Sequence, residues 1–389
     1  MSEANPELTD VAVLSNRSWL AGGGICISFS SPVMTDVTIK GNRTVSLGGG
    51  IYMDVSPATL LDVVIQENWG ADNGAGIYMD ESSPTLVGVA ILGNETQPNG
   101  WGGGLYLELS SPLLSDVTIS GNDCGFAGGG ICLDDSSPQL DQVFILDNHA
   151  SRGGGVFSED SSSTLTNVVI SGNDAYDYGG GIWIDDSAAT LTNVIVSRNR
   201  ASRGGGLYVR YSDPTLTNLT VIGNEADDWG GGLVLMGASP SMTNVAISHN
   251  TAGQGGGGIY ALSSSPAMVH CDSWDNGPDN YYGMTDPTGA DGNIAVDPGY
   301  LDVSDPDPLH WDLHLSISST LIDAGDPTVL DPDGSPSDMG AYGGPGADQW
   351  DLDWDGYPEW WIPGPYDPAT SPGMDCDDQD ASVYPGNGC

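Results

Sequence analysis

Carboxylates near the C-terminus have the spacing of a metal site. In residues 351–357 aspartates alternate with other residues and are followed by glycine and tyrosine. This order reproduces the first seven positions of a calcium-binding loop, where alternating carboxylates and one backbone carbonyl converge on an ion. The expected ligands are Asp351, Asp353, Asp355 and the carbonyl of Tyr357. The sequence therefore predicts Ca²⁺ as a cofactor, with a flexible acidic tail as the alternative.

The loop lacks the glutamate that usually occupies its twelfth position, because Ile362 stands there. Further oxygen ligands would come from Asp367 or from a second acidic cluster. That cluster contains Asp375, Asp377, Asp378 and Asp380. Carboxylate oxygens of this kind suit a hard cation, so we expect them to complete the site.

Another set of carboxylates recurs at one position of a repeat in the first half of the chain. Its members are Asp54, Asp80, Glu108, Asp134, Glu159 and Asp185, and Arg210 follows at the next recurrence. Like charges on neighbouring strands repel, so this column must extend into water, take up protons or bind cations. The alternative to such a solvated edge is a polysaccharide lyase or glycoside hydrolase, in which carboxylates act as general acid and base. Its catalytic residues would be Asp134, Glu159, Asp185 and Arg210.

Aromatic residues stand two positions before most of these carboxylates. The set includes Tyr52, Tyr78, Tyr106, Trp183 and Tyr208. Side chains alternate between the two faces of a strand, so these rings should share one outer face. A row of exposed rings suits contact with sugars, whereas rings stacked one strand apart also stabilise a sheet face or lie beneath a loop or subunit. Carbohydrate binding and structural packing are both kept as interpretations.

These positions recur because the chain repeats, mostly every 25 or 26 residues. The clearest markers are the asparagines at positions 16, 42, 68, 94, 122, 148, 173, 199, 224, 250 and 276. Between them lie short alternating stretches of β-branched residues bounded by Gly, Pro, Asn and Ser, a pattern typical of strands. A fixed period of this length is typical of a solenoid. We predict an all-β, right-handed parallel β-helix of about ten to eleven coils.

The same alternation predicts the interior of the rod. The first aliphatic residue after each glycine cluster should point inward and stack on its equivalents. These residues include Ile51, Ile77, Leu105, Ile131, Ile182, Leu207 and Leu233. The asparagine column should also turn inward, because its amides can satisfy turn backbone groups that would otherwise be buried without partners.

Two motifs resemble a known family. Gly48–Tyr52 reads Gly-Gly-Gly-Ile-Tyr and Val117–Asn122 reads Val-x-Ile-x-Gly-Asn. Both resemble the repeats of polymorphic outer-membrane proteins, within the pectate-lyase-like β-helix superfamily, over about residues 6–276. The resemblance implies an architecture and no single activity, since that superfamily includes lyases, hydrolases, tailspikes, adhesins and non-catalytic surface proteins. Asp375–Asp378 and the residues after it look like the Asp-Cys-Asp-Asp metal-binding repeat of secreted proteins from myxobacteria-like bacteria.

Composition limits the partners. The net charge is −45 over 389 residues, and no Lys or Arg follows Arg210. Such a polyanion cannot neutralise phosphates, which argues against nucleic acid and anionic membrane as partners. No apolar run is long enough to span a bilayer. Metal cations are the expected counter-ions. The predicted location is extracellular or the bacterial cell surface.

Three regions are expected: the β-helix at 1–283, a closing cap at 284–347 and the Asp-rich calcium-binding tail at 348–389. The cap would cover the last coil of the rod. Inside it, His310, Asp312 and His314 would share one strand face, either as metal ligands or as part of a closing strand.

The first coil is already complete at Pro6–Gly24. The few residues before it cannot cover its apolar cross-section, which predicts end-to-end self-association, further upstream coils or a partner surface. Together these features predict a non-catalytic extracellular or cell-surface rod that is structural or adhesive and stabilised by calcium. Its expected partner is a cell-surface glycan or another protein.

Overall fold

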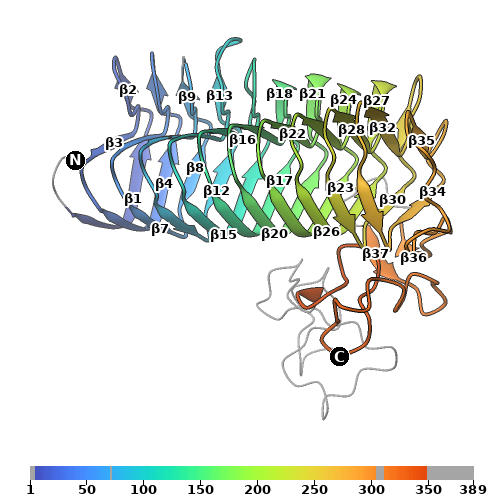
Figure 1. The fold of residues 1–389 in the computed structure, drawn as a ribbon. Coiled ribbons are helices and arrows are strands. Elements are labelled where there is room, and N and C mark those ends of the chain that lie inside the picture. Colours follow the sequence, from blue (N-terminus) through green and yellow to red (C-terminus); the bar gives the residue numbers. More distant parts are fainter. Residues whose placement is uncertain (1–4, 71, 304–310, 348–389) are drawn as a thin grey trace.

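The chain winds into a rod of parallel strands. The computed structural model describes residues 5–70, 72–303 and 311–347. In these ranges all the named elements are β-strands. Strands of successive coils pair in parallel, giving a right-handed parallel β-solenoid of about eleven coils (Figure 1). The predicted fold class of the repeat region is therefore confirmed.

Sheet A follows the glycine clusters and contributes one short strand from each coil. Its strands are β3 (Ile25–Ser28), β6 (Ile51–Asp54), β10 (Ile77–Asp80), β14 (Leu105–Glu108), β16 (Ile131–Asp134), β19 (Val156–Glu159), β22 (Ile182–Asp185), β25 (Leu207–Arg210), β28 (Leu233–Met236), β32 (Ile259–Leu262) and β35 (Tyr281–Tyr282). Equivalent positions are directly paired, as Ile51 with Ile77. Each column of the sequence repeat therefore becomes a column in space.

Sheet B is the longer wall of the rod. Its strands are β1 (Glu7–Leu14), β4 (Val33–Lys40), β7 (Thr59–Leu61), β8 (Val64–Gln66), β11 (Thr85–Val87), β12 (Ala90–Leu92), β15 (Leu113–Ser120), β17 (Gln139–Leu146), β20 (Thr164–Ser171), β23 (Thr190–Ser197), β26 (Thr215–Ile222), β29 (Ser241–Thr243), β30 (Ala246–Ser248), β33 (Ala267–Val269) and β34 (Asp272–Trp274). Each coil bends in the middle of this wall at a residue with positive φ, such as Asn193 at 53°. The bend lets Leu191 and Val194 both face the core.

Short strands between the asparagine and the glycine cluster of each coil form projecting arms, which stand as a comb along one side of the rod (Figure 1). One group contains β2 (Arg17–Ser18), β5 (Arg43–Thr44), β9 (Trp69–Gly70) and β13 (Glu95–Thr96). The other contains β18 (His149–Arg152), β21 (Asp174–Tyr178), β24 (Arg200–Arg203), β27 (Glu225–Trp229) and β31 (Thr251–Ala252). The sequence pattern predicted only short turns here.

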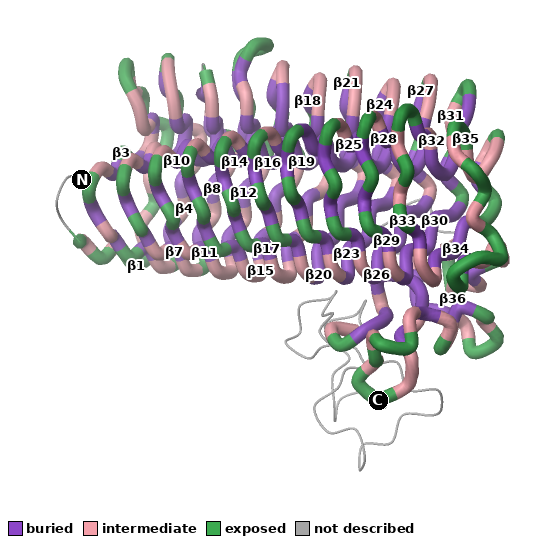
Figure 2. Tube along the Cα trace, viewed as in Figure 1, coloured by how far each residue is buried: buried purple, intermediate pink, exposed green. Residues whose placement is uncertain are grey.

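The interior confirms the predicted inward columns. All seven aliphatic residues named above as the first inward position are buried in one continuous core. Exposed residues instead concentrate at the corners of the coils and on the arms (Figure 2). Burial of stacked apolar side chains is the main force that holds such a rod together.

The asparagine column is also inward, as expected. The backbone N–H and the side-chain amide of Asn173 both donate to Oδ1 of Asn199, at 3.0 and 2.9 Å. The Asn199 amide in turn donates to the Ile170 carbonyl at 2.9 Å. Asn199 also donates to Oδ1 of Asn224, so it connects three consecutive coils and leaves few buried polar groups without partners.

A second polar ladder was not predicted. The backbone N–H of Ser56 donates to Oγ of Ser82 at 3.0 Å, and that hydroxyl donates to the Asp80 carbonyl at 2.8 Å. The same arrangement continues in successive coils at the corner after sheet A. The serine that recurs two positions after each carboxylate of the column was the sequence signal for it.

The segment expected to cap the rod packs along its side. β36 (Tyr300–Asp302) and β37 (Asp312–Leu315) pair antiparallel, and their neighbourhood lies against the later coils (Figure 1). Leu313 and Ala341 are buried with Val169, Ile195 and Ile222 on the outer face of sheet B. At the end of the rod, Tyr281 and Met284 pack against the core. The segment lies along the side of the rod because the outer face of sheet B is apolar in these coils. Burying that face removes an exposed apolar patch.

Candidate functional site

The aromatic residues predicted to share one face do so, on the outer side of sheet A. Tyr52, Tyr78 and Tyr106 stack with centroid distances of 5.5 and 5.1 Å. Trp183 and Tyr208 stack at 4.7 Å. Because none of these rings enters the coil interior, the predicted strand register is confirmed.

Four of the five rings are covered, as in the interpretation that places them beneath a loop. Tyr78, Tyr106, Trp183 and Tyr208 are only 4–6% exposed, and Tyr52 is partly buried. The arms fold over them and contribute further apolar side chains to the same cluster. These side chains include Leu47, Trp101, Phe126 and Tyr178. A sugar ring therefore cannot stack on the faces of the covered rings in this arrangement.

The sequence did contain a sign of this cover. Large residues stand directly before several glycine clusters, as in Leu47-Gly48, Trp101-Gly102 and Tyr178-Gly179. Arginines occupy the same place before Gly153 and Gly204. Arg152 lies 5.6 Å from the Trp183 ring, and Arg203 lies 4.3 Å from the Trp229 ring. The Arg152 contact adds to the burial that holds the arms on sheet A, and the Arg203 contact joins two neighbouring arms.

The carboxylate column lies at the end of the sheet A strands and is tied to neighbouring coils. The Tyr106 hydroxyl donates to Oδ2 of Asp134 at 3.0 Å, one coil further on, and Tyr78 makes the same contact with Glu108. Burial is the main cause that raises the pKa of both tyrosines, and the adjacent carboxylates add to it. Both hydroxyls therefore stay protonated and serve as donors that hold adjacent strands.

Arg210 closes the column by pairing with Asp185. Its Nε donates to Asp185 Oδ1 at 2.8 Å, and a second guanidinium nitrogen donates to Oδ2. The Asp185 side chain is only 3% exposed, so the ion pair neutralises a carboxylate that water cannot reach. The hydrogen bond to Asp185 raises the pKa of Arg210 further.

The four residues of the enzyme alternative are brought together. Asp134, Glu159, Asp185 and Arg210 are paired in register on β16, β19, β22 and β25. Burial, followed by Asp185 and Asp134, raises the pKa of Glu159, as a general acid would require. However, Asp134 and Asp185 are already engaged by Tyr106 and Arg210.

Three carboxylates of the column, Asp134, Glu159 and Asp185, are each followed directly by a second acid. Asp135, Asp160 and Asp186 are exposed corner residues with φ values of 46°, 49° and 44°. Aspartate enters this left-handed region more readily than most residues. The second acid of each pair is therefore explained by the backbone conformation of the corner. Its presence is not evidence that the carboxylate before it is catalytic.

The predicted calcium ligands Asp351, Asp353, Asp355, Tyr357, Asp375, Asp377, Asp378 and Asp380 lie outside the described residues. Within residues 5–70, 72–303 and 311–347 no group of three or more His, Cys, Asp and Glu side chains is arranged to hold a metal. His310 also lies outside the described residues, and His314 contacts Asp312 at 2.7 Å and packs on Tyr342. In the described part of the chain no helix is long and apolar enough to cross a membrane.

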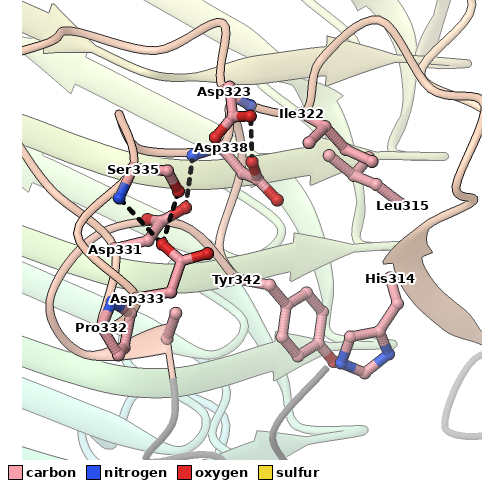
Figure 3. Close-up of a pocket in the computed structure, with 11 residues that line it drawn as sticks. His314, Leu315, Ile322, Asp323, Asp331, Pro332, Asp333, Ser335, Asp338 and Tyr342 are labelled. Atoms are coloured by element: carbon pink, nitrogen blue, oxygen red, sulfur yellow. Dashed lines mark hydrogen bonds between the residues drawn. The ribbon is translucent and has the colours of Figure 1, made fainter. Parts of the chain in front are cut away.

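A pocket lies within the segment that covers sheet B, and four aspartates line it: Asp323, Asp331, Asp333 and Asp338 (Figure 3). Asp331 accepts hydrogen bonds from the backbone N–H groups of Asp338 and Gly344. Burial raises the pKa of Asp331 to about 7 and that of Asp338 to about 6. Hydrogen bonds from Ser335 lower the pKa of Asp333.

Together the coils, the polar ladders and the covered aromatic face define an all-β solenoid that is built from sequence repeats. The family model for the right-handed β-helix region matches residues 2–167 and 154–290, and the chain belongs to this family. No match to the chain was found among curated proteins or among solved structures. The narrower resemblances to polymorphic outer-membrane-protein repeats and to the Asp-Cys-Asp-Asp repeat stay predictions.

Proposed function

We propose that the protein is a non-catalytic β-helix rod with a structural and adhesive role, outside the cell or at its surface. The observation that carries this proposal is the engagement of two of the three candidate catalytic carboxylates. Asp134 is held by Tyr106 and Asp185 by Arg210, each across one coil. Carboxylates used to hold successive coils together are not poised to exchange protons with a substrate.

The test is a search for cleavage. The full chain is incubated with polygalacturonate, alginate and neutral glycans, and new reducing ends and unsaturated uronates are measured. The proposal expects neither product above the level of a chain carrying Glu159→Gln. Cleavage that disappears in this variant would establish the polysaccharide lyase or hydrolase alternative instead.

Calcium stabilisation through the acidic tail belongs to the same proposal. A net charge of −45 makes cation binding favourable, because bound cations relieve repulsion within the chain. The alternating aspartates at 351–355 supply the oxygen ligands that Ca²⁺ prefers. Thermal unfolding with Ca²⁺ and with a chelator tests it, and equal midpoints would contradict it.

End-to-end self-association is also proposed. Among the described strands β1 pairs only with β4, and Leu8, Val11 and Val13 are only partly buried there. A strand edge with apolar side chains favours pairing with a further strand, which a second chain would supply in this proposal. Sedimentation over a range of concentrations tests this, and a strictly monomeric rod would overturn it.

A further inference from the structure

The arms in the second half of the rod alternate in length. β18 and β24 have four residues each, whereas β21 and β27 have five. Ala175 pairs with Ala201, but the next pair is Tyr178 with Arg203, so β21 carries one extra residue. The pairing of β24 with β27 slips in the same way. Such bulges redirect side chains out of the regular ladder.

The alternation produces a groove on the arms. β24 lies between the longer β21 and β27 in the sheet order. The groove is lined by residues of these three arms, among them Tyr176 and Asp177 from β21, Arg200 and Ser202 from β24, and Asp227 from β27, and by His149 of β18, which pairs with Asp123. We call it the arm groove. Its lining shares no residue with the buried aromatic cluster or with the carboxylate column, so it is a distinct surface.

Tyr176 gives the arm groove an open aromatic surface. It is 78% exposed, unlike the covered rings of sheet A. The corresponding places on the neighbouring arms hold small side chains, Ser151 and Ser202. The ring face is therefore open to a ligand that presents C–H groups or a cation.

The charges of the arm groove determine which kind of ligand it favours. Arg200 donates to Asp227 at 2.9 Å, so its positive charge is already partnered. Asp174 and Asp177 add two further carboxylates to the lining. The arm groove is therefore net negative and rich in acceptors. It opposes an anionic polysaccharide and favours a ligand with hydroxyl and ammonium donors.

We propose that the arm groove binds chains of amino sugars with free amino groups. The sugar ring lies on Tyr176, its ammonium group pairs with Asp174 or Asp177, and its hydroxyls reach Ser202. An aromatic surface with a few convergent polar groups is the usual composition of a ligand site. This inference rests on the proposed function, because it gives the adhesive rod its contact surface and ligand class.

The test is calorimetric titration of the full chain with a glucosamine hexamer. Binding is expected to weaken about tenfold in Tyr176→Ala and to persist in Tyr176→Phe, because phenylalanine keeps the ring. Asp177→Asn should weaken binding of the glucosamine hexamer more than binding of the N-acetylated hexamer, which lacks the ammonium groups. Trp19→Ala is the matched control, because this ring is 72% exposed on another arm, and it should leave affinity unchanged.

No binding by the unmodified chain, or equal affinity in Tyr176→Ala, would overturn the amino-sugar proposal. Neither result affects the rod function, which fails only if the chain cleaves a polysaccharide in a Glu159-dependent way. Cleavage together with Tyr176-dependent binding would keep the arm groove and reject the non-catalytic function. The two proposals are thus separable.

Discussion

The Asn193 side-chain amide donates a hydrogen bond of 2.7 Å to the carbonyl of Ala341, 148 residues further along the chain. It donates a second one of 2.7 Å to the Gly343 carbonyl. Asn193 is one of the bend residues of sheet B, and the type of residue in this column changes along the rod. It is aspartate at 10, 36, 62 and 116 and asparagine at 167, 193, 218 and 244, all with positive φ. The covered coils thus have a neutral donor where most earlier coils have a charge, with Gly88 and Gln142 as the exceptions.

We expect Asn193→Asp to release the C-terminal segment. A carboxylate there would face two carbonyl oxygens without a donor, which should weaken docking by about 2–5 kcal/mol. The substitution should not strain the backbone, because Asp36 occupies the same bend position with a positive φ. Hydrogen exchange of residues 338–347 measures the effect. Asp116→Asn is the matched control and should leave exchange of this segment unchanged, whereas slow exchange in Asn193→Asp would contradict the prediction.

Removing Arg210 should destabilise the rod. Arg210→Ala leaves Asp185 buried without its partner, and because Arg210 is 41% exposed we discount the usual cost to about 2–3 kcal/mol. Urea unfolding measures it. The control is Arg200→Ala, whose partner Asp227 is as exposed as Arg200 itself, and it should cost less than about 1 kcal/mol. Equal losses in the two variants would contradict a structural role for the Asp185 pair.

Asn199→Ala should be among the most damaging single changes in the rod. It removes the acceptor for two donors of Asn173 and the donor to Ile170, all fully buried, at an expected cost of about 3–5 kcal/mol. The control is Asn16→Ala in the same column, where the side chain is exposed and the loss should be small. Thermal unfolding of both variants provides the comparison, and similar midpoints would argue against the ladder as a source of stability.

Docking of the C-terminal segment should weaken as pH rises. Burial raises the pKa of Asp338 to about 6 and that of Asp331 to about 7, whereas in the unfolded chain both ionise near about 4. Their stabilising contribution is therefore full below about pH 4 and is lost as pH rises through about 6 and 7. Limited proteolysis should cut this segment faster at pH 8 than at pH 5. The double variant Asp331→Asn with Asp338→Asn should remove most of the pH dependence of the cleavage rate. An unchanged pH dependence in this variant would show that other groups cause it.

The predicted tail site should account for the tightest calcium binding. Asp353→Ala with Asp355→Ala removes two of the expected oxygen ligands, so calorimetry should lose the highest-affinity step. Asp72→Ala with Asp123→Ala removes the same charge from exposed positions on the arms and should retain that step. If both double variants bind calcium alike, the affinity comes from overall charge and not from the tail.

The repeat region could be predicted from the sequence because one coil determines the next. Ile51 pairs with Ile77, and Asn173 with Asn199, at the same place in each repeat, so periodicity alone predicts which residues meet. Alternation within a strand then decides which side chains face inward. The calcium site of the tail rests on spacing alone and stays a prediction.

Only the tertiary structure decided what covers the outer faces. Tyr106 and Trp183 follow the outward pattern, yet the arms bury them, since the residues between asparagine and glycine vary from coil to coil and form a layer instead of plain turns. The contact of Asn193 with Ala341 likewise joins a repeated residue to a stretch without repeats. A repeating pattern determines neighbours one coil apart. How a non-repeating segment folds back depends on which apolar surfaces and unpaired polar groups the finished rod leaves open, and those exist only once the coils have assembled.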